Sequence, residues 1–330
     1  MADRGEVELP DRSGWLELFG AVELVLALLS AMLIVFMIVM TRIPPPSGMG
    51  PNVSPMRLQI LLPGVCIYGV AAVFWAVMGV GSIKGTRWAR ALTLIASWIW
   101  LVIGVMGFVM MLTMVPSMIR MINESGPAGQ QPPPGVIQLM IAFQMALMGI
   151  LAVAMPLTFV LFYGSASVKA TVERLDLKVR WTDRRPLPIL GMSLVLAFGT
   201  LQAFAIIPMS TGMPFFGRML YGTPMIIFTL AISIFMLYLA WAVWRLDIKG
   251  WFGALALLIL GITSTVLTFR HIDLVDLYTR MGVPKEQLEQ MKKFQFLQPG
   301  QMEWLFAIYL VIGLAFLWYV RRFFKPKPSS

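Results

Sequence analysis

Cysteine and histidine are almost absent from this sequence. The 330 residues contain one of each, Cys66 and His271. One cysteine cannot form a disulfide within a chain. A zinc site of cysteines and histidines, or a haem held by two histidines, also lacks its ligands. We therefore expect neither a metal ion nor a cofactor.

Charged residues are scarce as well. They make up 13% of the chain, whereas soluble domains carry about 25%. Hydrophobic residues make up 58% and the mean hydropathy is +0.80. This composition predicts a polytopic membrane protein whose main partner is the lipid bilayer. The net charge of +10 does not indicate nucleic-acid binding, because the basic residues are scattered between apolar runs instead of forming a basic domain.

Catalytic motifs are absent too. The chain contains no Walker sequence, no Gly-x-Ser-x-Gly and no His-Glu-x-x-His, and these are the motifs that place nucleophiles, phosphates or metals. We expect no enzymatic activity.

Long apolar runs are what the sequence has in abundance. A helix needs about 20 apolar residues to cross a bilayer. Eight runs qualify: 15–41, 62–83, 91–115, 136–163, 188–210, 224–244, 251–270 and 303–320. We predict an all-α fold of eight transmembrane helices.

The basic residues predict the orientation. With the N-terminus inside, 17 of the 26 Lys and Arg residues fall on the cytoplasmic side and nine outside, as the positive-inside rule requires. The first run is too long for a signal peptide, so we expect it to be retained. We predict a multi-pass protein of a bacterial inner membrane with both termini in the cytoplasm.

The two halves of the chain resemble each other. Residues 43–49 (IPPPSGM) match 207–213 (IPMSTGM) at four of seven positions, and Lys84-Gly85 recurs as Lys249-Gly250. Chance similarity between apolar sequences is the alternative. Because four spans per half is an even number, the repeats would share one orientation, as in transporters with parallel repeats.

This pattern defines three regions. They are an N-terminal membrane repeat (1–164), a charged cytosolic linker (165–187) and a C-terminal membrane repeat (188–330) with an outer loop (271–302). The architecture favours a transporter for a small solute. The alternative is a non-catalytic structural or accessory subunit of a larger membrane complex, with other membrane subunits as partners.

Two acids lie in the first run, Glu17 and Glu23. An acid inside a membrane is a candidate for proton or cation coupling. Alternatively, residues 24–41 nearly span the bilayer by themselves at ~1.5 Å per residue. Glu23 would then lie at the inner interface and Glu17 in water.

The other polar residues in the spans are amides and hydroxyls. Gln144, Gln202 and the run Thr263-Ser264-Thr265 are candidates for lining a substrate path. The plainer interpretation is helix packing, because such groups bond neighbouring helices or their own helix.

Methionines recur every four residues in the third span, at Met106, Met110, Met114 and Met118. Thioethers at this spacing could pass Cu(I). The alternative is an apolar packing face, for which methionine is a flexible filler.

The linker begins with a helical pattern that we expect to continue the fourth span into the cytosol. Asp176 and Arg180 have the spacing of an ion pair. Trp181 is placed to dock on headgroups, and Arg184 and Arg185 could bind anionic lipid. The plainer interpretation is a basic loop that fixes topology.

Overall fold

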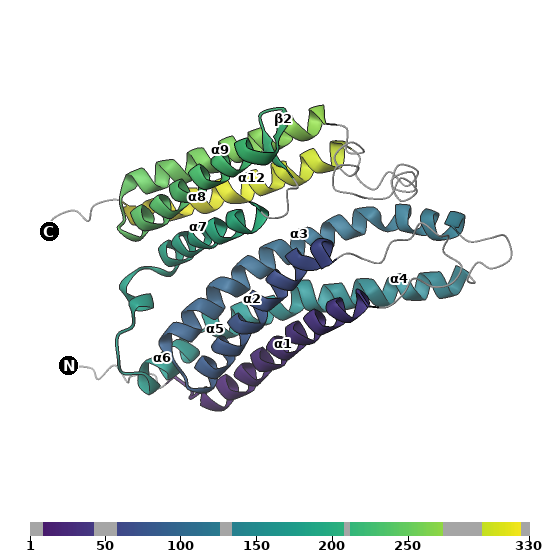
Figure 1. The fold of residues 1–330 in the computed structure, drawn as a ribbon. Coiled ribbons are helices and arrows are strands. Elements are labelled where there is room, and N and C mark those ends of the chain that lie inside the picture. Colours follow the sequence, from purple (N-terminus) through teal and green to yellow (C-terminus); the bar gives the residue numbers. More distant parts are fainter. Residues whose placement is uncertain (1–8, 43–57, 126–133, 208–211, 273–298, 325–330) are drawn as a thin grey trace, which may run out of the picture. The chain divides into compact units, whose positions relative to one another are not determined.

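Long helices make up almost all of the computed structural model (Figure 1). The structure describes residues 9–42, 58–125, 134–207, 212–272 and 299–324. The main helices are α1 (Ser13–Met40), α2 (Leu58–Ile83), α3 (Arg87–Ser125), α4 (Pro134–Gly149), α5 (Met155–Gly164), α6 (Ala166–Leu175), α7 (Leu187–Ile206), α8 (Gly222–Trp244), α9 (Ile248–His271) and α12 (Pro299–Arg321). The expected outer loop 271–302 lies almost wholly outside the described residues, as does the segment 43–49.

Seven helical segments of the described residues are long and apolar enough to cross a membrane. They correspond to every predicted run except the fifth. That run forms α7, whose Leu187–Ala203 portion is a shorter apolar helix. The chain is therefore an integral, multi-pass membrane protein.

The chain forms two compact units. Unit 1 comprises residues 1–98 and 157–185, and unit 2 comprises residues 99–156 and 186–330.

In unit 1, α1 and α2 pack backbone against backbone. A Cβ atom at Gly20 would lie 2.8 Å from the carbonyl oxygen of Gly79, and a Cβ at Gly79 would lie 2.8 Å from the carbonyl oxygen of Gly20. Reciprocal glycines permit the close approach by which small residues hold membrane helices together.

A π-helical turn, η1 (Ile150–Ala154), joins α4 to α5. Pro156 follows it and has no N–H for the carbonyl of Ala152, four residues earlier, so the regular ladder cannot continue there. The Ala152 carbonyl instead contacts α3 at Gly104, where any Cβ would overlap it. In unit 2 the glycine and the π-turn thus fit each other.

Unit 2 has an apolar core formed by α7, α8, α9, α12 and the 3₁₀ turn η4 (Arg322–Phe324) that follows α12. Its buried residues are Ile189, Met192, Leu196, Leu239, Ala240, Val243, Trp251, Ala254, Leu317, Val320 and Phe324. Polar groups at the helix contacts are bonded: Ser193 Oγ donates to the Ala240 carbonyl at 2.7 Å, and Trp251 Nε1 donates to the Leu317 carbonyl at 2.8 Å.

A short β-hairpin precedes α8, so the fold is not purely helical. Its strands are β1 (Met213–Phe215) and β2 (Arg218–Leu220). The two turn residues, Phe216 and Gly217, have φ angles of 41° and 89°, as the common hairpin turns require. The sequence did not predict this hairpin, because Phe at the first turn position is not a favoured residue there.

Three local expectations are corrected. The third helix does not end at residue 115 but continues through Pro116 to Ser125. The fourth span does not run unbroken into the linker, because Ser165 leaves the helical conformation (φ −67°, ψ 146°) and its Oγ caps α6. Lys249-Gly250 lies in the first turn of α9, whereas Lys84-Gly85 lies between α2 and α3, so these two pairs are not equivalent.

Candidate functional site

A buried polar cluster joins four helices of unit 1. Glu23 on α1, Ser82 on α2, Thr93 on α3 and Tyr163 on α5 are all 0–1% exposed. The Tyr163 hydroxyl lies 2.9 Å from Glu23 Oε1 and 2.9 Å from Ser82 Oγ. Because this hydroxyl carries one proton, it can donate to the carboxyl group while it accepts from Ser82. We call these four residues the Glu23 cluster.

The cluster is polar but incompletely satisfied. Glu23 Oε2 and Thr93 Oγ1 are buried and make no hydrogen bond of good geometry to the described residues. None of the ion pairs in the described part of the chain involves Glu23. A buried carboxylate without a cation is costly, so this site suits a carboxyl group that carries a proton.

Aromatic rings surround the cluster. Phe19 stacks on Phe162 with ring centroids 3.9 Å apart, and Phe159 lies 6.1 Å from the ring of Tyr163. Trp75 lies 6.0 Å from Phe159. These large side chains shield the Glu23 carboxyl group from solvent.

Chain order explains why sequence reasoning found only one member of the cluster. Glu23 stood out as an acid in an apolar run, but Tyr163 is 140 residues away and Ser82 is another isolated hydroxyl. Glu17, the second acid of α1, is exposed. The structure therefore separates the two acids, with Glu23 in the interior and Glu17 on the surface of unit 1.

The other substrate-path candidates are not brought to the cluster. Gln144 on α4 and Gln202 on α7 are exposed, as is Thr263 on α9. Ser264 Oγ accepts from the Phe216 N–H at 2.9 Å and donates to the Pro214 carbonyl at 3.2 Å. Ser264 thus holds the hairpin onto α9.

The remaining hydroxyls of α9 are bonded locally. Thr268 Oγ1 accepts from the Gly217 N–H at 3.0 Å and so supports the same hairpin. Thr265 Oγ1 donates to the Gly261 carbonyl of its own helix at 2.8 Å, the back-bonding that the plainer interpretation expected.

The methionine stripe of α3 is only partly enclosed. Met106 is buried, whereas Met110 and Met114 are partly buried, and the side chain of Met118 lies outside the described residues. Packing stays the prediction for this stripe, and copper passage stays its alternative.

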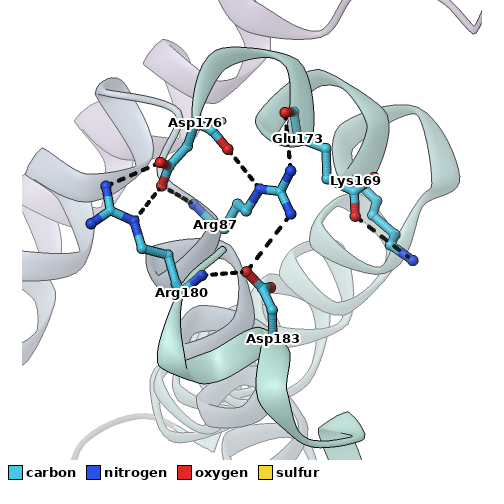
Figure 2. A network of polar contacts seen from close by, with 6 residues as sticks. All are labelled: Arg87, Lys169, Glu173, Asp176, Arg180 and Asp183. Carbon is cyan, nitrogen blue, oxygen red and sulfur yellow. Dashed lines mark hydrogen bonds and ion pairs between the residues drawn. The ribbon is translucent and has the colours of Figure 1, made fainter. Parts of the chain in front are cut away.

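A second polar network lies at the end of unit 1 where the linker folds back on α3 (Figure 2). Arg87 Nε donates to the Asp176 carbonyl at 2.7 Å, and its Nη1 lies 3.8 Å from Asp183 Oδ2. Arg180 donates two hydrogen bonds to the Asp176 carboxylate, at 2.8 and 3.0 Å. The predicted pair of Asp176 and Arg180 is confirmed, although it forms beyond the end of α6.

The hydrogen bonds from Arg180 hold the pKa of Asp176 below its ordinary value, with further help from the Arg87 backbone N–H. The pKa of Asp11 is lowered in the same way by the backbone N–H of Ser13, and next by the charge of Arg174. Both carboxylates therefore stay ionised at neutral pH. Arg184 is exposed and Arg185 partly so.

Comparison with known proteins adds nothing to this geometry: no family model, curated protein or solved structure matches the chain.

Proposed function

We propose that the protein is a transporter-like integral membrane protein in which Glu23 binds and releases a proton. The observation that carries this proposal is the complete burial of the Glu23 carboxyl group, whose Oε1 accepts from the Tyr163 hydroxyl while Oε2 makes no hydrogen bond of good geometry to the described residues. Ionisable residues within membrane helices commonly serve proton or ion coupling. The proposed role is not enzymatic, and the transported species is a small solute.

An internal repeat of two parallel halves supports the proposal. From the end of α2 at Ile83 to the end of α8 at Trp244 is 161 residues, and the starts of α3 at Arg87 and α9 at Ile248 are separated by the same number. A uniform shift across a turn is what a duplicated helical hairpin produces.

The two turns also have the same conformation. Thr86 N–H bonds the Gly81 carbonyl and Gly85 N–H bonds the Ser82 carbonyl, with φ of 60° at Gly85. In the second half Asp247 N–H bonds the Ala242 carbonyl and Leu246 N–H bonds that of Val243, with φ of 62° at Leu246. Both are Schellman motifs, and all four pairs of equivalent positions differ by 161 residues.

Packing next to the turns follows the same shift. A Cβ at Gly81 would lie 2.6 Å from the Ala89 Cβ, and a Cβ at Gly250 would lie 3.0 Å from the Ala242 Cβ. Gly81 corresponds to Ala242 and Ala89 to Gly250. Each half thus has one glycine and one alanine in this contact, but the glycine is on the first helix in one half and on the second helix in the other.

The repeat assigns counterparts to the Glu23 cluster. The shift of 161 pairs Ser82 with Val243 and Thr93 with Ala254. Tyr163 and Val320 each precede the last residue of their helix. Gly20 contacts Gly79, as Ser193 contacts Ala240, so Glu23, three residues beyond Gly20, pairs with Leu196.

All four counterparts, Leu196, Val243, Ala254 and Val320, belong to the apolar core of unit 2. The same helix arrangement can therefore be packed with aliphatic side chains alone. Since replacing buried polar groups by packed apolar ones is often neutral or stabilising, a polar cluster in one half only points to a functional role for it.

The proposal also includes the number of membrane crossings and the side of the membrane on which the termini lie. The helix α7 has 20 residues, or about 30 Å at 1.5 Å per residue, which matches the hydrocarbon core of a bilayer. With α7 as the eighth crossing, both termini lie on the cytoplasmic side of a bacterial inner membrane, where the basic residues are most numerous.

The first test is whether Glu23 carries the proton. Infrared difference spectra of the purified protein in lipid should show the carbonyl band of a protonated carboxyl group. Glu23→Gln should remove this band, and Glu17→Gln, which changes an exposed acid on the same helix, should keep it. A band that survives Glu23→Gln in a monodisperse, folded variant would contradict the assignment.

The second test asks whether proton binding moves charge. Proteoliposomes on a solid-supported membrane should give a transient current after a pH step, larger than that of protein-free liposomes. Glu23→Gln should reduce the current to the protein-free level and Glu17→Gln should leave it unchanged. A wild-type signal equal to that of empty liposomes would speak against transport.

One observation favours the accessory-subunit alternative. Gln144 is exposed among exposed apolar side chains of α4, namely Met140, Phe143 and Leu147. An amide on such a face calls for a hydrogen-bonding partner, because lipid tails offer none. Pull-down in mild detergent with mass spectrometry would recover stoichiometric membrane partners if this alternative is correct.

A further inference from the structure

In the stretch between α6 and the 3₁₀ turn η2 (Trp181–Arg184), apolar side chains are exposed and charged side chains face the protein, the reverse of a water-facing loop. Its two ends are extended, with φ and ψ of −111° and 92° at Asp176 and −92° and 164° at Arg180, and the chain bends between them at Lys178. The outward side carries Leu177 and Val179, which are 82% and 71% exposed.

The inward side carries the charges. Asp176 and Arg180 face the protein and form the network with Arg87. A segment in water would place these charges outward and the aliphatic side chains inward. Trp181, two residues beyond Val179, is also exposed, so Leu177, Val179 and Trp181 are three exposed apolar residues at alternate positions.

The segment is also held at the ends of membrane-spanning helices. Leu175 contacts Gly85 in the turn between α2 and α3. Asp176 accepts from the backbone N–H of Arg87, the first residue of α3, at 3.3 Å. Two residues, Arg185 and Pro186, separate η2 from the start of α7 at Leu187. A segment tied to these points lies at the level where the lipid headgroups begin.

Basic side chains accompany the apolar ones. Lys178 and Arg184 are exposed, and no ion pair is formed by either in the described part of the chain. Leucine and tryptophan on one side with lysine and arginine beside them is the composition that binds anionic membrane interfaces.

We propose that residues 175–184 form a lipid-binding strap, in which Leu177 and Val179 insert into the acyl boundary and Lys178 and Arg184 bind anionic headgroups. The strap does not depend on proton binding at Glu23. It assigns Asp176 and Arg180 a positioning role, because their pairing with Arg87 turns the intervening aliphatic side chains outward.

Depth-dependent quenching tests the insertion. In full-length Cys66→Ser protein reconstituted into nanodiscs, a single cysteine at Leu177 or Val179 would carry an environment-sensitive fluorophore. Lipids with a nitroxide near the headgroup should quench it several-fold more than they quench a label at Glu173, which is exposed on α6. Equal quenching at Leu177 and Glu173, or iodide quenching at Leu177 as strong as at Glu173, would overturn the proposal.

Lipid charge tests the basic residues. Native mass spectrometry of the wild type should retain phosphatidylglycerol in preference to phosphatidylcholine. Lys178→Gln with Arg184→Gln should lower this preference by about fivefold for each residue removed. Lys169→Gln, which removes an exposed lysine paired with Glu173 on α6, should leave it unchanged. An unaltered preference in the double variant, or shielding of residue 177 by a co-purifying protein, would refute the strap.

Discussion

The Tyr163 hydroxyl group makes both of the hydrogen bonds described above for the Glu23 cluster. Removing it in Tyr163→Phe would leave Glu23 Oε1 and Ser82 Oγ buried without this partner. Unsatisfied buried polar groups each cost about 1–3 kcal/mol, so we expect a clear loss of stability, measured as a lower unfolding temperature in detergent or lipid.

Tyr319→Phe is the matched control for this change. Tyr319 occupies the last turns of α12 but is exposed, so losing its hydroxyl should leave the unfolding temperature unchanged. Equal stability of the Tyr163 and Tyr319 variants would show that the hydroxyl in the cluster is not needed for folding.

At this scale the sequence could supply only one partner of each buried contact. Glu23 was recognisable because an acid in an apolar run is rare. Its bond to Tyr163 depends on how α1 and α5 pack, and the sequence around residue 163 does not indicate this packing. Ser264 was recognisable as polar, but its bonds to the hairpin required the turn at Phe216-Gly217 to be known first.

At the scale of the element, the contact between α3 and η1 depends on one glycine. Gly104→Ala would place a Cβ against the Ala152 carbonyl, which the π-turn and Pro156 hold in place. Overpacking of this kind costs about 1–3 kcal/mol, so the unfolding temperature should fall.

Gly107→Ala, one turn later on the same helix, separates packing from helix propensity. A Cβ there meets no atom within 4 Å, and alanine favours a helix by up to ~1 kcal/mol over glycine. The control should therefore be as stable as the wild type or more so. Stabilisation by both substitutions would mean that α3 and η1 are not in contact.

The linker should respond to acid through Asp176. Its pKa is lower in the folded linker than in the open one because Arg180 donates to the carboxylate. The stabilisation is therefore fully present above the ordinary pKa and is lost as the pH falls below about 4. Hydrogen-exchange protection of residues 173–184 should decline over that window.

Asp176→Asn should show the reduced protection already at neutral pH, with no further loss in acid. Glu173→Gln is the control, because that carboxylate forms an exposed pair with Lys169 at 3.9 Å and such pairs contribute little. Loss of protection in the Glu173 variant as large as in the Asp176 variant would exclude the network as its cause.

The length of the apolar runs predicted the helices well, because a chain in the bilayer must satisfy its backbone N–H and C=O groups internally and a helix does so. The ends were harder to predict. The third run was predicted to end at residue 115, yet α3 continues through Pro116, because membrane helices tolerate a proline where the freed backbone groups find other partners. The break at Ser165 was also missed, although a serine before Val168 fits the N-cap preference.

At the scale of the whole molecule, the proposed repeat has a different offset for each pair of helices, whereas the sequence suggested a single offset. The hairpins α2–α3 and α8–α9 differ by 161 residues, whereas the ends of α5 and α12, at Gly164 and Arg321, differ by 157. If the halves are a repeat, as we propose, insertions outside the spans have shifted the register between helices, and one constant offset places Lys249-Gly250 opposite the wrong residues. A repeat whose helices keep their contacts while their registers drift is difficult to align from sequence alone.

The number of crossings decides the topology, and it depends on α7. The seven helical segments of clear spanning length would put the two termini on opposite sides of the membrane, whereas an eighth crossing by α7 puts them on the same side. We expect the same side, because α7 is about 30 Å long by its 20 residues and an even number keeps both basic ends inside. Reporter fusions at each terminus, one active only in the cytoplasm and one only outside it, measure this directly. Reporters in opposite compartments would make α7 a helix that does not cross, and the two halves could then no longer share one orientation.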